Sequence, residues 1–190
     1  MSADSYSVKL GPVQLLWERG PDRWHHQLVS GENVILASEE GCTADLFPPS
    51  PAYQEMLIEH PGPGLCEFQL IGQSGKTIYS ASVRVDTQAR TVDFDCCARI
   101  KQADAATRSI ASYRLAQGVS RSGGTDELTL DWKSAAIRLT AIPTGGAAVR
   151  LHDEGELWSA GWFHPAPVDS VRGSSFRWGY RIAVESGAGR

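Results

Sequence analysis

Most of the sequence consists of short stretches in which apolar and polar residues alternate, separated roughly every 8–12 residues by turn-forming Gly, Pro, Asp or Ser. Successive side chains of a β-strand point to opposite faces of the sheet, so this alternation is typical of antiparallel strands with one buried face. In the strand expected at 92–100, Val92, Phe94 and Cys96 alternate with Asp93 and Asp95. The pattern constrains the architecture strongly and the chemistry hardly at all.

The chain has 190 residues, of which 42% are hydrophobic, enough for one substantial core. Two meanders are visible, at 65–100 and at 128–163, but no residue-level repeat relates them. We therefore predict a single all-β domain over residues 1–190. It should be an antiparallel β-sandwich or barrel-like fold of about a dozen strands built from meanders, with at most one or two short helices.

Two segments interrupt the alternation. Residues 43–64 form a proline-rich loop segment, which encloses residues 52–60. Because proline lacks the donor that a central strand needs, the enclosed stretch should be an edge strand or a short helix starting at Pro51, with the strand favoured. Residues 119–125 contain Gly123 and Gly124 and are predicted to be a flexible loop.

Neither cysteine nor histidine spacing indicates a metal site. Cys96 and Cys97 are adjacent, as are His25 and His26, and neighbours on a strand face opposite sides. We expect free buried thiols, one inward and one outward histidine, no metal and no cofactor.

No stretch reaches the roughly 18 apolar residues of a membrane span, and the first residues do not resemble an export signal. We therefore expect a soluble, cytoplasmic protein that does not contact a membrane. The formal net charge is −4, and basic residues are not interleaved with exposed aromatic residues, so nucleic acid is not an expected partner.

Two groups of residues are candidates for ligand binding. Trp158 and Trp162 flank the small Ala160 at a spacing of two, which would suit a small apolar or sugar-like ligand or, equally, close packing between sheets. Four arginines fall on the expected outward faces of strands and would form an anion-binding patch if those strands are neighbours. These arginines are Arg138, Arg150, Arg177 and Arg181.

One group is a candidate for catalysis. His60 lies near Glu55 and Glu59, and a desolvated carboxyl group beside histidine can transfer protons if the segment folds over a cavity. The alternative is a solvated polar edge. The sequence contains no nucleophile elbow, phosphate-binding loop or dinucleotide-binding glycine motif.

These observations favour a non-catalytic module that binds a small ligand or another protein. A first alternative is a structural or homo-oligomerising domain that uses its sheet edges or an apolar face. A second is a metal-independent enzyme that uses the His/Glu pair.

Overall fold

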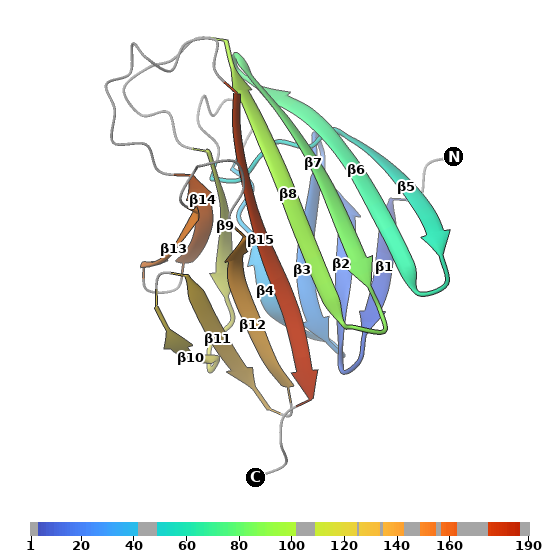
Figure 1. Cartoon of the computed structure of the whole chain (residues 1–190), viewed down its shortest axis with the longest axis vertical. Helices are drawn as coiled ribbons and strands as arrows, with labels where there is room; N and C mark the ends of the chain where they lie inside the picture. Colours follow the sequence, from blue (N-terminus) through green and yellow to red (C-terminus); the bar gives the residue numbers. More distant parts are fainter. Residues whose placement is uncertain are drawn as a thin grey trace.

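The computed structural model describes residues 4–41, 49–101, 109–124, 126–133, 135–142, 149–154, 157–162 and 175–186. These residues form two antiparallel sheets that lie face to face, and no helix is found among them (Figure 1). The predicted all-β sandwich is therefore confirmed. No helix in this part of the chain could cross a membrane.

The smaller sheet has seven strands. Their spatial order is β1 (Ser5–Leu10), β2 (Val13–Arg19), β3 (Trp24–Ser30), β4 (Asn33–Ser38), β9 (Ser109–Leu115), β14 (Leu157–Trp162) and β13 (Val149–Glu154). Consecutive strands pair within β1–β4, but β9 joins β4 to β14 and so connects residues far apart in the sequence.

The larger sheet has eight strands. Their spatial order is β10 (Ser120–Gly123), β11 (Glu127–Trp132), β12 (Ala135–Ile142), β15 (Ser175–Ser186), β8 (Thr91–Ile100), β7 (Thr77–Asp86), β6 (Leu65–Ser74) and β5 (Glu55–Gly62). The meander β6–β7–β8 forms as the alternating pattern predicts, and Val92, Phe94 and Cys96 on the predicted core face are all buried.

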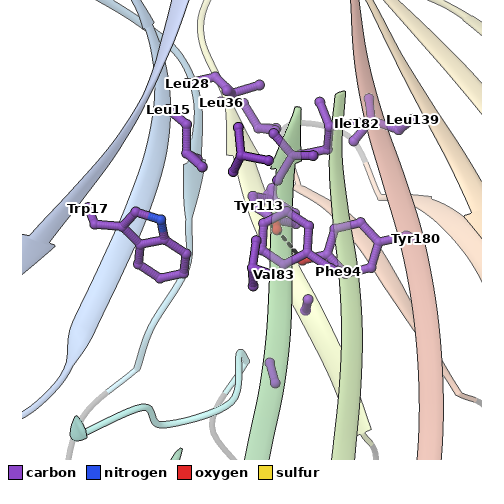
Figure 2. Close-up of a cluster of buried hydrophobic side chains, with 14 of the residues drawn as sticks. Leu15, Trp17, Leu28, Leu36, Val83, Phe94, Tyr113, Leu139, Tyr180 and Ile182 are labelled. Carbon is purple, nitrogen blue, oxygen red and sulfur yellow. Dashed lines mark hydrogen bonds between the residues drawn. The ribbon is translucent and has the colours of Figure 1, made fainter. Parts of the chain in front are cut away.

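The core lies between the inner faces of the two sheets (Figure 2). The Phe94 and Tyr180 rings stack with centroids 4.5 Å apart, and Trp17 and Trp178 are completely buried. Cys66 and Cys96 are buried free thiols, as predicted. Cys97 is also a free thiol and lies on the opposite face from Cys96, as expected, but it is only half-buried. Cys42 lies outside the described residues.

Two local predictions have different outcomes. Residues 55–62 form β5, an edge strand rather than a helix, as favoured from its flanking prolines. Residues 120–123, predicted as loop, instead form the short edge strand β10, which pairs with β11. Gly123 explains this difference: a Cβ there would lie 2.3 Å from the Glu127 carbonyl oxygen, so glycine permits the close approach of the two strands.

Substitution of Gly72→Ala should destabilise the fold by about 2–4 kcal/mol. A Cβ at Gly72 would lie 1.8 Å from the carbonyl oxygen of Ala52, and backbone atoms cannot move aside cheaply. The matched control is Gly124→Ala, because a Cβ at that position meets nothing within 4 Å. Urea unfolding measures both variants, and equal stabilities would contradict the tight packing of residue 52 on β6.

Candidate functional site

The exposed side of β5 and β6 carries an apolar hollow. Leu57 is 59% exposed and Ile71 is 48% exposed, two of the three large hydrophobic residues found exposed in the described part of the chain. Together with Glu55, Gln69 and Ser80 they line a hollow of about 320 Å³ on the outer face of the larger sheet. Exposed apolar side chains that cluster in this way often mark a contact surface.

Among the described strands, β5 has a neighbour on one side only. It pairs with β6, and no described strand lies beyond it, so it forms the outer margin of the larger sheet (Figure 1). Both ends are closed: the Arg19 guanidinium donates to the Gln54 carbonyl oxygen, and the register shifts between Glu59 and Gly62, where Pro61 lacks a donor. Residues 55–60 are therefore the stretch where another strand could pair.

A second hollow, of about 670 Å³, follows the connection between β9 and β10. Its lining consists of the consecutive residues 115–121 of one segment. It is therefore the concave side of a turn, without polar groups that converge on it from separate elements.

Three of the four arginines of the predicted patch lie on neighbouring strands, but each of the three is paired with a carboxylate. Arg138, Arg177 and Arg181 lie exposed on the outer face of neighbouring strands β12 and β15, as expected. Arg177 forms a bidentate ion pair with Asp95 on β8. Arg138 Nη2 lies 2.6 Å from Glu185 Oε1.

Arg181 forms a second bidentate pair with Asp93, at 2.5 and 2.8 Å. These hydrogen-bonded carboxylates raise the pKa of Arg177 and of Arg181. Since the carboxylates occupy the guanidinium groups, this face is poorly suited to a further anion. The Arg150 side chain lies outside the described residues.

The ion pairs belong to a cross-strand row that ends in unbalanced negative charge at β5. The register places Asp93 opposite both Arg181 and Arg84, and Arg84 opposite Glu67. Arg84 Nε lies 3.9 Å from Glu67 Oε1. The last step of the row places Glu59 opposite Glu67, and like charges directly opposite each other are unfavourable.

Glu55 and Glu59 have no ion-pair partner among the described residues, and both are exposed on β5. They lie on the same face as Leu57, because every second residue of a strand points the same way. Within the described structure, this edge therefore combines the exposed Leu57 side chain with two carboxylates that have no ion-pair partner.

His60 takes part in a different set of contacts. Its Nε2 is hydrogen-bonded to the Tyr6 hydroxyl of β1 at 3.0 Å, and Tyr6 also contacts the Cys66 thiol at 3.9 Å. Burial raises the pKa of Tyr6 and of Cys66. In the described structure no hydrogen bond or ion pair joins His60 to Glu55 or Glu59, so these contacts do not assemble the acid–base cluster.

Trp158 and Trp162 lie on β14, whose backbone pairs with β9 and β13. The register places Trp158 opposite Tyr113 on one side and Asp153 on the other. Because their side chains fall outside the described residues, the proposed aromatic platform stays a prediction.

A buried polar network that includes His26 connects the two sheets. Its Nε2 and the Tyr113 hydroxyl are hydrogen-bonded at 2.8 Å. Tyr113 of the smaller sheet is in turn hydrogen-bonded to Tyr180 of the larger sheet, as Figure 2 shows. Burial lowers the pKa of His26 to about 3, so the imidazole is neutral near pH 7. His25 faces outward, 3.6 Å from Glu18, which confirms the predicted inward and outward pair.

A second buried polar group lies at one end of the smaller sheet. Arg23 is 2% exposed, donates to the Glu40 carbonyl oxygen at 2.8 Å, and forms an ion pair with Asp22 at 2.7 Å. Burial raises the pKa of the Glu40 carboxyl to about 7, and its Oε2 has no hydrogen-bond partner among the described residues. The sequence gives no indication of this site, because the run Glu39-Glu40 is typical of a solvated turn.

No protein-family model matches the sequence, and no curated protein matches it either. The geometry is thus the basis for any functional conclusion.

Glu40→Gln should alter the pH dependence of stability. The folded pKa of about 7 lies above the ordinary value of 4.5, so the native state holds the proton more tightly and loses stability as the pH rises through 7. The stability of Glu40→Gln relative to the native chain should therefore rise by about 2–3 kcal/mol between pH 4.5 and pH 8. Urea unfolding measures it, with exposed Glu32→Gln as control, and a pH-independent difference would contradict the assignment.

His26→Gln should change the pH dependence of stability in the opposite direction to Glu40→Gln. The folded pKa of about 3 lies below the ordinary value of 6.5, so the native state is destabilised as the pH falls from 6.5 towards 3. The stability advantage of the native chain over His26→Gln should shrink by roughly 3 kcal/mol between pH 7 and pH 4. His25→Gln, at the outward-facing neighbour, is the control in the same unfolding series, and a constant advantage for His26 would refute its neutral burial.

Proposed function

We propose that this protein is a non-catalytic interaction module whose free edge strand β5, with the adjoining face of β6, docks an extended segment of a partner protein. The observation that carries the proposal is the coincidence of an unpaired strand edge with the exposed side chains of Leu57 and Ile71 around one hollow. Each feature alone is common, but together they match the requirements for strand addition.

Strand addition supplies affinity and selectivity from separate sources. The backbone of residues 55–60 offers N–H and C=O groups to an incoming strand, which provides affinity independent of sequence. The hollow beside Leu57 and Ile71 would accept an apolar side chain, which provides selectivity. Covering these two side chains also removes apolar surface from water, worth about 25 cal/mol per Å².

A second copy of the chain fits this edge less well. An antiparallel pair of β5 strands centred on Leu57 would bring Glu55 of each copy opposite Glu59 of the other. Two such carboxylate pairs would oppose the contact. Charge therefore favours a different protein over self-association.

The proposal can be tested with a photo-reactive amino acid placed at Leu57, at Ile71 or at Val34, which is 40% exposed on the other sheet. In a lysate of the native organism, positions 57 and 71 should capture the same protein and position 34 should not. The captured protein is then purified and its affinity for the whole chain is measured.

Leu57→Lys should weaken that affinity at least about tenfold, because it places a charge in the apolar contact, whereas the matched Val34→Lys should leave it unchanged. The proposal fails if positions 57 and 71 capture nothing, if all three positions capture the same proteins, or if Leu57→Lys binds normally.

A further inference from the structure

The charge pattern of β5 specifies the chemistry of its partner more narrowly. Resting on the proposed function, we infer that the docked strand carries two basic residues on either side of a central apolar residue, in the order basic–x–apolar–x–basic. The basic side chains lie opposite Glu55 and Glu59, and the apolar one lies opposite Leu57.

The first step of the argument is the alternating row on the outer face of the larger sheet. Arg181 on β15, Asp93 on β8 and Arg84 on β7 follow one another with opposite sign, and Arg84 is near Glu67 on β6. The alternation fails at the margin, where Glu59 on β5 stands opposite Glu67. A basic side chain on a strand beyond β5 would give Glu59 a cross-strand partner of opposite charge.

The second step is the position of Glu55. It lies opposite the exposed Ile71 in the register, so its carboxylate has an apolar cross-strand neighbour and no ion-pair partner among the described residues. A basic residue on the partner would pair with this carboxylate at one rim of the hollow. Pairs of opposite charge across adjacent strands are favourable. On β5 itself, no basic residue of the described chain competes for the Glu55 carboxylate.

The third step is the spacing along the strand. Glu55, Leu57 and Glu59 occupy every second position and point to the same face, whereas Met56 and Ile58 pack against the core. Since the two carboxylates are symmetric about Leu57, the partner pattern reads the same in parallel or antiparallel orientation. The x residues of the partner would point to the opposite face, on the side where Tyr6 and His60 are hydrogen-bonded to each other.

The experiment uses two synthetic peptides with the whole chain. One has the sequence Thr-Arg-Thr-Val-Thr-Arg-Thr and the other has glutamate in place of both arginines; both are capped at the ends. Fluorescence anisotropy measures their affinities at low and physiological salt. The arginine peptide should bind at least about tenfold more tightly, and the difference should shrink as salt screens the exposed charges.

Charge reversal on the protein provides the matched comparison. The double variant Glu55→Lys with Glu59→Lys should prefer the glutamate peptide. The control, Glu32→Lys with Asp131→Lys, changes the net charge equally at exposed positions away from β5, and it should keep the preference for arginine. Bound arginine peptide should also slow amide exchange in residues 55–60, because their backbone groups become paired.

The outcomes separate the two proposals. Equal binding of both peptides, lost in Leu57→Lys, would overturn the charge pattern and leave the docking edge intact. Absence of binding by the arginine peptide, or binding without protection of the β5 amides, would also overturn the inferred pattern. In either case the capture experiment at positions 57 and 71 decides the proposed function independently.

Discussion

Contact between the inner faces of the two sheets is the interaction on which the rest of the structure depends. Neither sheet could bury its apolar side alone, and the large aromatic residues span the gap between them. Trp17 and His26 of the smaller sheet lie with ring centroids 4.4 Å apart, and His26 is 5.2 Å from Phe94 of the larger sheet. The hydrogen bonds from His26 through Tyr113 to Tyr180 give partners to buried polar atoms that would otherwise lack them.

The sequence predicts the parts of this fold that depend on neighbouring residues. The alternation at 92–100 identifies the buried face of β8 correctly, because side-chain direction along a strand follows from position alone. The same reasoning separates His25 from His26. The loop prediction from glycine fails at Ser120–Gly123, because Gly123 instead allows this segment to approach β11 closely.

What the sequence does not predict are relations between distant segments. The position of β9 between β4 and β14 joins residues from three parts of the chain, and no local pattern encodes it. The same limit applies to the arginines: their outward direction follows from alternation, but their neutralisation depends on Asp93, Asp95 and Glu185 on adjacent strands. Glu40 shows the limit most clearly, because its burial depends on how Arg23 and the end of the sheet surround it.

A sandwich of two open sheets must leave edges, and its edges differ in how they discourage pairing. The edge strand β10 is only four residues long and fully polar, while β1 alternates Ser5, Ser7 and Lys9 on its exposed side. The short length of β10 and the polar exposed side of β1 both disfavour pairing with another strand. The eight-residue β5 places Leu57 at the centre of its exposed face, and the interruptions lie near its ends, where Arg19 binds the Gln54 carbonyl oxygen on one side and Pro61 follows the register shift on the other. In the proposed docking at this edge, the acidic residues beside Leu57 would oppose a second copy of the chain and favour a basic strand, so charge would make the contact selective.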